Sequence, residues 1–356
     1  MKQIEVTASK EYTVEIGAGL LTGVHSGYLR WWLVNLSNDP VMIVSDDIVY
    51  DLYGETLRRS LDNSVRKVHT FVFPNGEQSK NLSTYGELME ALSENGFTRS
   101  SSIFALGGGV VGDLAGFAAA TYQRGIKVYQ VPTTLLAAVD SSVGGKTAVD
   151  LKSGKNQVGC FWQPSHVICD TNVFATLPEE QYRCGCAEII KYGMIGDAEF
   201  FAWLEDNDVR DDYEYVIAKC VTAKRDIVGR DEFEKGERML LNFGHTLGHA
   251  AEKCSGYTLP HGYAVAMGMA AVTRAAVSLG YCGKETLDRL LAILNKYSLP
   301  TEIPYDAEPV TQAILFDKKR TGSDINMVCP KKIGECVLMN VPYKDIPLWV
   351  RLGGVK

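Results

Sequence analysis

The pattern of hydrophobic and polar positions changes about halfway along the chain. In the first half, short apolar runs typical of buried strands alternate with segments of helical period. The strand-like runs are "VMIVSDD" (Val41–Asp47), "VRKVHTFVF" ending before Pro74, "SSIFALGGG" and "KVYQVPTT", and the N-terminal "MKQIEVTASKEYTVEIG" alternates like a strand. Helical period is found from Ile48 to Leu61 and through "LSTYGELMEALSENG", which stops at Gly96. This alternation predicts an α/β domain with a mostly parallel sheet that is covered by helices on both faces.

A different pattern begins after Leu177-Pro178. From Glu179 to about Ser298 nearly every segment has helical period, and only the tail near "INMVCP" and "GECVLMN" looks extended again. We therefore predict an α/β domain at residues 1–178 and a mainly α-helical domain at residues 179–356. We expect the functional site in the cleft between them, because ligand sites favour domain interfaces.

Composition narrows the classes of partner. The 356 residues are 46% hydrophobic and 22% charged, which suits packed cores rather than disorder. A net charge of −7 argues against nucleic acid or an acidic membrane surface as a partner.

The nine cysteines are scattered, so we predict free thiols in a reducing compartment. The N-terminus does not read as a signal peptide, and the most apolar run, Ala264–Gly280, is short and interrupted by Arg274, so we predict a soluble cytoplasmic protein.

Two glycine-rich segments indicate anion binding. "LGGGVVGDLAG" contains Gly107-x-Gly109-x-x-Gly112 between a strand and a helix, where glycines let the backbone approach a pyrophosphate. The ribose-binding acid expected about twenty residues later is missing, so we predict a dinucleotide site unlike the standard Rossmann unit, with a structural turn as the alternative. "VDSSVGGKTAVD" ends like a nucleotide-triphosphate loop, but Asp140 occupies the position of its first glycine. The anion at this second segment is therefore not expected to be a triphosphate.

Three of the six histidines fall within seventeen residues. His245 and His249 lie four apart on one helical face, and His261 follows a proline at a predicted helix start. Position 246 is Thr, so the pattern is not that of a metalloprotease helix. We interpret the cluster as a catalytic Zn²⁺ site with three protein ligands, with ordinary core or surface histidines as the alternative. Glu188 is a candidate carboxylate ligand, because an acid in an apolar helix segment is costly unless it is paired or metal-bound.

Six segments resemble one protein family, in order along the chain: "LGGGVVGDLAGF", "VPTTLLAAVDSSVGGKTAVD", "GKNQVGCFWQP", "AEIIKYGMI", "LNFGHTLGHAAE" and "HGYAVAMGM". Together they resemble the 3-dehydroquinate synthase family, from about Asp46 to "FDKK" near Lys318. The resemblance implies a dehydroquinate synthase-like fold and a carbon–oxygen lyase of the shikimate pathway, which serves aromatic amino acid biosynthesis. It implies that 3-deoxy-D-arabino-heptulosonate 7-phosphate (DAHP) is converted to 3-dehydroquinate and phosphate. The implied steps are transient oxidation with NAD, phosphate elimination, re-reduction and an intramolecular aldol reaction.

The resemblance also implies roles for residues whose motifs match. The implied metal ligands, for Zn²⁺ with Co²⁺ as the alternative, are Glu188, His245 and His261, so His249 becomes a hydrogen-bonding group beside the metal or the substrate and not a ligand. The implied NAD-binding residues are Asp46, Glu77, Lys80, Gly108, Gly109, Val110, Asp113, Thr133, Thr134, Lys146, Lys155 and Thr176. The implied substrate-binding and catalytic residues are Asp140, Lys146, Asn156, Lys191, Lys224, Arg238, Asn242 and His249, with Arg124 at the phosphate and either Lys318 or Lys319 as a further lysine. A homodimer is implied as well.

Related enzymes remain as alternatives. A glycerol dehydrogenase-type polyol dehydrogenase resembles the fold, cofactor and metal site but has no need for so many phosphate-directed cations. Among sugar phosphate cyclases, Arg238 and the "GKN" triplet favour the dehydroquinate branch over 2-deoxy-scyllo-inosose synthase, whereas aminodehydroquinate synthase would keep the same residues. A non-catalytic relative is disfavoured because no catalytic motif position is visibly broken. Lys152 and Cys160 depart from the family pattern without obviously disabling the site.

Overall fold

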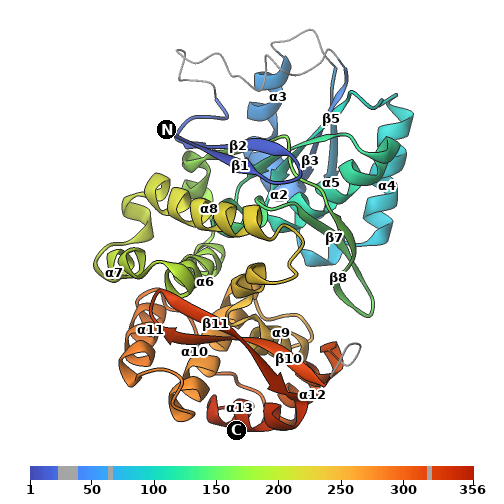
Figure 1. Cartoon of the computed structure of the whole chain (residues 1–356). Helices are drawn as coiled ribbons and strands as arrows, with labels where there is room; N and C mark the ends of the chain where they lie inside the picture. The colour runs from blue at the N-terminus through green and yellow to red at the C-terminus, as the bar shows by residue number, and fades with distance from the viewer. Residues whose placement is uncertain (23–38, 63–66, 319–322) are drawn as a thin grey trace. The chain divides into compact units, whose positions relative to one another are not determined.

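The computed structural model describes residues 1–22, 39–62, 67–318 and 323–356, and the chain forms two compact units (Figure 1). The first unit contains Met1–Leu177 and Tyr213–Glu232, and the second contains Pro178–Asp212 and Phe233–Lys356.

The first unit is built on a seven-stranded sheet with the order β1-β2-β9-β6-β5-β3-β4. Its strands are β1 (Lys2–Thr7), β2 (Glu11–Gly17), β3 (Val41–Asp46), β4 (Val68–Phe73), β5 (Ser102–Gly107), β6 (Lys127–Pro132) and β9 (His166–Asp170). Only the β1–β2 pair is antiparallel among these neighbours, and this confirms the mostly parallel sheet. The helical segments of this unit are α2 (Asp47–Val49), η1 (Tyr50–Gly54), α3 (Glu55–Asp62), η2 (Glu77–Ser79), α4 (Leu82–Glu94), α5 (Gly109–Thr121), η3 (Tyr122–Arg124), η4 (Ala137–Ser141), η5 (Thr171–Thr176) and α8 (Tyr213–Arg230).

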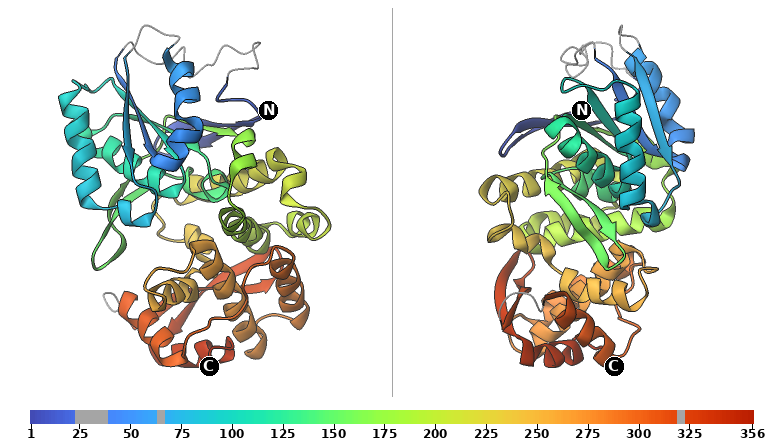
Figure 2. Two further views of the ribbon diagram at one scale, coloured as in Figure 1. Left: turned by 180° about the vertical axis from the view of Figure 1, so that it is seen from behind. Right: turned by 90° about the vertical axis from the view of Figure 1, so that its right-hand side faces the viewer.

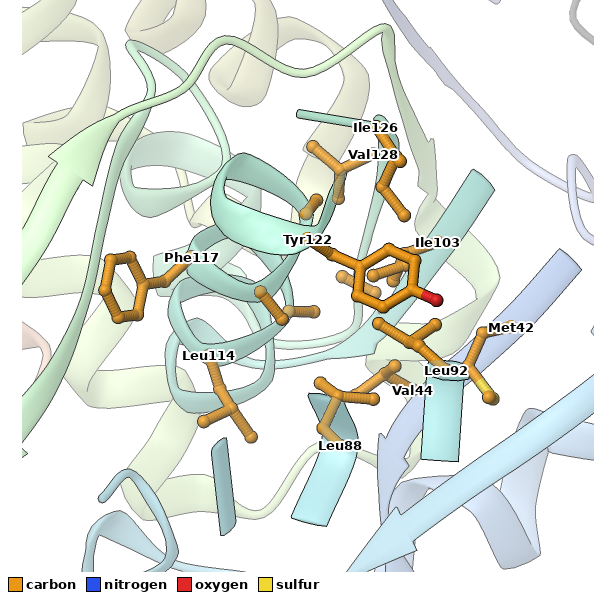
Figure 3. Packing of buried hydrophobic residues seen from close by; sticks show 14 of the residues in the cluster. Met42, Val44, Leu88, Leu92, Ile103, Leu114, Phe117, Tyr122, Ile126 and Val128 are labelled. Carbon is orange, nitrogen blue, oxygen red and sulfur yellow. The ribbon is translucent and has the colours of Figure 1, made fainter. Parts of the chain in front are cut away.

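The core of the first unit lies on both faces of this sheet. Every residue of β3 and β5 is buried, as expected for parallel strands covered on both sides. On one face, Met42 and Ile103 pack against Leu88 of α4 and Leu114 of α5 (Figure 3). Successive strand residues point to opposite faces. Phe104 of β5 therefore lies on the other face, where its ring stacks on that of Tyr129.

The sheet order reverses between β3 and β5. The chain passes from β3 to the edge strand β4 and then returns past β3 to form β5. In open parallel sheets, ligands bind beyond the carboxyl ends of the strands at such a reversal. The carboxyl ends of β3 and β5 are Asp46 and Gly107, so the topology directs attention to the segments that follow these two residues.

Two features of the first unit were not predicted. Strands β7 (Lys146–Leu151) and β8 (Gly154–Phe161) form a separate antiparallel hairpin, which the glycine-rich sequence concealed. Helix α8 joins the first unit, whereas the predicted division at residue 178 left it with the helical part. The reason is that α8 packs against β1, β2 and η4, and a helical period does not reveal which unit a helix covers.

The second unit is mainly helical, as its pattern predicts. Its helical segments are α6 (Glu179–Gly196), α7 (Ala198–Asp206), η6 (Val209–Asp211), η7 (Glu237–Asn242), α9 (His245–Cys254), α10 (His261–Ser278), α11 (Lys284–Lys296), α12 (Ala307–Lys318), η8 (Tyr343–Asp345) and α13 (Ile346–Leu352). The extended tail is the antiparallel pair β10 (Asp324–Lys332) and β11 (Glu335–Pro342), visible beside the helices of this unit in Figure 2. Within the described ranges, none of the helices combines the length and apolar character that a membrane span requires.

Candidate active site

Glu188 lies in the most protected part of helix α6. Its side chain is 1% exposed, and a buried carboxylate must be compensated by a cation, a metal ion or hydrogen bonds. Lys191, one helical turn further along, places its Nζ 2.5 Å from Glu188 Oε2 and is equally buried. This pair occupies one oxygen of the carboxylate and leaves Oε1 directed toward two imidazoles.

The three predicted metal ligands come together at this oxygen. Glu188 Oε1 lies 3.6 Å from His245 Nε2 and 3.3 Å from His261 Nε2. The three donor atoms all lie within 4.8 Å of one another. Zinc–ligand bonds of about 2.0–2.2 Å in tetrahedral geometry would set donor atoms about 3.3–3.6 Å apart. The two distances from Glu188 Oε1 therefore match those expected around a single Zn²⁺ or Co²⁺ ion.

The orientation of both imidazole rings also suits metal binding. His245 Nδ1 lies 3.2 Å from the carbonyl oxygen of Phe243, and His261 Nδ1 lies 3.5 Å from Glu252 Oε1. Both oxygens can accept a hydrogen bond from Nδ1, an arrangement that would leave Nε2 of each ring to bind a metal ion on the side of Glu188. Metal-binding histidines are usually held in this way by a carbonyl or a carboxylate.

The two histidines differ in their protonation. Burial lowers the pKa of His245 to about 3, against the raising effect of Glu188, so this ring is neutral at physiological pH. Burial acts in the same direction on His261, but hydrogen bonding to Glu188 and Glu252 outweighs it and raises the pKa to about 10. The position between these two carboxylates therefore favours a positive charge, which a proton supplies here and which a divalent cation could supply instead.

Glycines allow the helices that carry these residues to approach closely. A Cβ on Gly262 of α10 would lie 2.3 Å from Cys184 Cα of α6, and one on Gly268 would lie 1.9 Å from the carbonyl oxygen of Gly244 at the start of α9. Gly244 has φ +81°, a left-handed conformation that favours glycine. The absence of side chains at these contacts sets the distance of α10 from α6 and α9, and so brings His261 to Glu188 and His245.

His249 occupies a different environment. Its ring lies 5.3 Å from His245 and 6.0 Å from His261, centroid to centroid, but its side chain is 50% exposed. Its Nε2 faces Glu252 Oε2 at 3.9 Å and not Glu188. Sequence spacing alone suggested that His245 and His249 share the metal. The geometry instead favours Glu188, His245 and His261 as the ligand set.

Glu252 was missed by sequence reasoning. It is buried and faces both His249 and His261, and these three residues form a second group whose donor atoms lie within 4.8 Å. The available signal was an acid directly after two alanines in a helix that the pattern places in the core, the same signal that singled out Glu188.

Other predicted residues of the second unit are placed by η7 and α12. Arg238 is buried in η7, and Asn242 at its end donates from Nδ2 to Glu234 Oε1 at 2.8 Å. Lys318 is the last residue of α12, and Lys319 lies outside the described residues.

The predicted cofactor residues of the first unit follow the carboxyl ends of successive parallel strands. Asp46 ends β3, where its carboxylate caps α2 by accepting from the Val49 N–H at 2.9 Å. The others are Glu77 and Lys80 after β4, Gly108, Gly109, Val110 and Asp113 after β5, Thr133 and Thr134 after β6, and Thr176 after β9. Because the strands are parallel, these segments share one edge of the sheet, as a nucleotide site in an α/β fold requires.

Lys80 is buried at this edge and lies at the centre of a cluster of three carboxylates. Its Nζ lies 3.1 Å from Glu77 and from Asp113, and 4.0 Å from Asp150. Burial alone would lower the pKa of Lys80, but these carboxylates outweigh it and raise the pKa above its ordinary range. Burial raises the pKa of Asp113 despite the nearby Lys80. Asp150, which the sequence did not single out, also accepts from the Asn156 N–H at 2.7 Å and so links this cluster to the β7–β8 hairpin.

The start of α5 fits a pyrophosphate. Gly108 and Gly109 begin a 13-residue helix that has no side-chain cap, so the backbone N–H groups of its first turn remain available to an anion. A Cβ on Gly108 would meet Thr134 at 3.0 Å, and one on Gly109 would meet Ser141 at 3.3 Å. The Oγ1 of Thr133 is buried and, among the described residues, has no hydrogen-bond partner. By contrast, Gly112 faces the packed interior, because its Cβ would lie 2.8 Å from Gln130 Oε1, so a larger residue there would displace the Gln130 side chain.

The predicted substrate residues of the first unit are mostly cations. Lys224 is buried on α8 and donates to the Asp140 carbonyl at 2.8 Å and to its carboxylate. Lys146 and Asn156 are exposed and Lys155 is half-buried on the β7–β8 hairpin. Arg124 is exposed and, within the part of the chain that the structure describes, forms no ion pair; both it and Gln123 have positive φ values, a strain that is common at functional sites.

Comparisons with known proteins agree with this architecture. Residues 70–184 match the family model for the 3-dehydroquinate synthase N-terminal domain, and residues 185–320 match that for its C-terminal domain. The 3-dehydroquinate synthase of Pelobacter propionicus is 45% identical over 86% of this chain and 88% of its own length. That of Clostridium acetobutylicum is 41% identical over 99% of this chain and 100% of its own length.

Solved structures give the same result. A 2-deoxy-scyllo-inosose synthase complexed with carbaglucose-6-phosphate, NAD⁺ and Co²⁺ has a TM-score of 0.88 and 29% identity, covering 98% of this chain and 99% of its own. The 2-epi-5-epi-valiolone synthase of Streptomyces hygroscopicus, with NAD⁺ and Zn²⁺ bound, has a TM-score of 0.87 and 27% identity over 99% of each chain. Glycerol dehydrogenase from Schizosaccharomyces pombe shares the fold alone, at a TM-score of 0.63 and 15% identity over 99% of this chain and 91% of its own.

The sheet edge with its glycine turn, and the carboxylate–imidazole cluster of the helical unit, define the class of nucleotide- and metal-dependent enzymes that contains the sugar phosphate cyclases. Within this class, the chain belongs to the 3-dehydroquinate synthase family.

Proposed function

We propose that this chain is a 3-dehydroquinate synthase that converts DAHP to 3-dehydroquinate and phosphate. Family membership over nearly the whole chain supports this reaction. The single observation that carries the chemistry is the cluster in which one donor atom each of Glu188, His245 and His261 lie within 4.8 Å of one another.

Glu188, His245 and His261 would hold a divalent cation, Zn²⁺ or Co²⁺. When bound, NAD would remove and return a hydride at one substrate carbon, and the metal ion would make the hydroxyl at that carbon more acidic. The Phe243 carbonyl and the Glu252 carboxylate would favour the Nδ1–H tautomers of His245 and His261, which would leave each Nε2 for the ion. The chain also keeps Lys191 at the second oxygen of Glu188, which leaves Oε1 for the ion.

NAD binding is proposed for the strand-end residues of the first unit. The uncapped N–H groups at Gly108 and Gly109 would bind the pyrophosphate, and Thr133 Oγ1 would gain the hydrogen-bond partner it lacks among the described residues. Lys80 holds Glu77 and Asp113 in fixed positions, which orients their carboxylates for hydrogen bonds. The remaining proposed NAD residues are Asp46, Val110, Thr134, Lys146, Lys155 and Thr176.

Substrate binding is proposed for a set of cations and amides. Arg124 would bind the phosphate, which its charge and its lack of an ion-pair partner within the described ranges support. Fixed cations stabilise a leaving phosphate at little reorganisation cost. The other proposed contacts are Asp140, Lys146, Asn156 and Lys224 in the first unit, and Lys191, Arg238, Asn242, His249 and Lys318 or Lys319 in the second.

A cyclase and a dehydrogenase differ in what they release. With DAHP and NAD at less than one equivalent per substrate, we expect phosphate to be released over many turnovers without accumulation of NADH, because the cofactor is regenerated. Steady NADH production from a polyol would instead indicate a dehydrogenase. Parallel assays with glucose 6-phosphate and with the amino analogue of DAHP would test the 2-deoxy-scyllo-inosose and aminodehydroquinate alternatives.

We further propose a homodimer in the cytoplasm. All nine cysteines are free thiols, which is consistent with a reducing compartment. The dimer rests on the family resemblance, and a molecular mass from light scattering equal to that of one chain would contradict it.

A further inference from the structure

The side chains on one face of α9 do more than supply a single ligand. His245, His249 and Glu252 are spaced four and three residues apart, so they share one face of this helix. His245 points to Glu188, whereas Glu252 reaches across to His261 on α10. The same helix therefore contacts the metal cluster at two places.

Each oxygen of the Glu252 carboxylate faces an imidazole. Oε1 lies 3.5 Å from His261 Nδ1, and Oε2 lies 3.9 Å from His249 Nε2. The carboxylate side chain is 3% exposed. A charged group with so little solvent must be compensated by its neighbours, and its neighbours here include one proposed metal ligand and one proposed substrate group.

From this geometry we infer that Glu252 is a positioning residue, which holds His261 in the Nδ1–H tautomer and in the ring orientation that directs Nε2 to the metal. This inference rests on the proposed function of Glu188, His245 and His261 as ligands. The same carboxylate would orient His249 through its other oxygen.

A ligand role for Glu252 itself is less consistent with the geometry. His261 belongs to both candidate metal groups, with Nε2 toward Glu188 and Nδ1 toward Glu252. A ring that bound one ion at each nitrogen would have to lose both of its protons. His249, the third member of the second group, is half exposed.

The test measures Zn²⁺ binding to the full chain by competition with a chromophoric chelator, without substrate. Glu252→Gln keeps the shape of the side chain, but its amide can turn an N–H toward His261 and stabilise the wrong tautomer. We expect its Kd for Zn²⁺ to rise about 10–100-fold, the usual effect of losing such a partner, and the visible spectrum of the Co²⁺ form to change. Glu252→Asp keeps the negative charge but places it one methylene further back, so its Kd for Zn²⁺ should rise less.

Glu205→Gln is the matched control, because Glu205 is a carboxylate of the same unit that pairs with Arg289 at 2.5 Å and belongs to neither metal group. It should bind Zn²⁺ as the wild type does. An equal loss in this variant would mean general destabilisation and would overturn the inference, as would wild-type affinity in Glu252→Gln. Loss of a second equivalent of Zn²⁺ in Glu252→Gln would make Glu252 a ligand, which also overturns it.

Two further outcomes are distinguishable. If Glu252→Gln does not fold, Glu252→Asp decides, since a wild-type Kd and an unchanged Co²⁺ spectrum in that variant would refute a positioning role. If the wild-type chain binds no Zn²⁺, the proposed metal site fails, whereas a normal wild type with unaffected variants refutes only the role of Glu252.

Discussion

The two candidate sites of this chain are built in opposite ways. In the first unit, the residues follow the ends of parallel strands, and the order of the strands brings them to one edge. In the second unit, Glu188, His245 and His261 come from three helices, and their meeting depends on how those helices pack. One site is a consequence of topology and the other a consequence of close packing.

The sites also differ in charge. Lys80 already supplies the cation for the carboxylates around it. At the second site, Glu188 and Glu252 flank His261, and this arrangement favours an additional positive charge. Removal of the Lys80 charge should therefore destabilise the folded first unit. Removal of a charged or metal-binding side chain at the second site should chiefly abolish binding of the ion.

The largest effect is expected from His261→Ala. Without this imidazole the donor set loses one of three ligands, so zinc retention and turnover should both be abolished. Zinc content by atomic emission after dialysis measures the first. His249→Ala is the matched control and should retain zinc. Full zinc occupancy in His261→Ala would refute the ligand assignment.

Lys80→Met should destabilise the first unit by about 3 kcal/mol, the lower end of the range for breaking a buried ion pair, because Glu77 is partly exposed. NAD affinity should fall as well, whereas zinc affinity should not. Chemical unfolding monitored by circular dichroism gives the stability change. Lys152→Met, at an exposed lysine of the same unit, should be neutral. An unchanged stability in Lys80→Met would show that the Lys80 charge does not stabilise the carboxylates around it.

Arg124→Ala tests whether the first unit also holds an uncompensated cation for a ligand. It should weaken the phosphate-bearing substrate by about 2–5 kcal/mol, by analogy with charged interface contacts, and should weaken NAD far less. Calorimetric titration of both ligands measures this. Arg99→Ala, another exposed arginine of the unit, serves as control. Equal losses for the two ligands would mean that Arg124 supports the fold instead.

Gly262→Ala tests the dependence of the metal site on packing. The added Cβ would lie 2.3 Å from the backbone of Cys184, so α10 must move away from α6. We expect a loss of about 1–3 kcal/mol in stability from overpacking, accompanied by weaker zinc binding. Gly196→Ala, at a glycine of α6 with no atom within 4 Å of its added Cβ, should change neither. Unchanged zinc affinity in Gly262→Ala would show that the metal site does not depend on the close approach of α10 to α6.

The smallest effect is expected at a buried pair outside both sites. Glu15 on β2 lies 3.3 Å from His166 on β9. Burial would raise the pKa of Glu15, but the hydrogen bond and charge of His166 outweigh it and lower the pKa. A lowered carboxyl pKa contributes stability above the unfolded-state pKa, and that stability is lost as pH falls through the folded-state pKa. Glu15→Gln should therefore flatten the acid side of a Tm–pH curve, with zinc and NAD affinities unchanged. A curve identical to that of the wild type would show that the Glu15–His166 pair does not contribute to stability in this way.

Much of the first unit could be predicted from the sequence. Its strands have period-two or continuous apolar patterns, and parallel strands place their carboxyl ends together whatever the side chains are. The glycine segment after β5 was therefore recognisable as a candidate dinucleotide site, whereas the segments after β3 and β6 were indicated only by the family resemblance. The role of Asp150 was not recognisable, because the β7–β8 hairpin that brings it near Lys80 has no such pattern.

The second unit shows what only the tertiary structure decided. Helical period identifies which residues face a core, but it does not say which helices become neighbours, and so α8 was assigned to the wrong unit by pattern alone. The sequence by itself marked Glu188, His245 and His261 as unusual residues. Their convergence, and the position of Glu252 behind His261, depend on backbone contacts at Gly244, Gly262 and Gly268, where distance is set by the neighbouring helix and not by local preference.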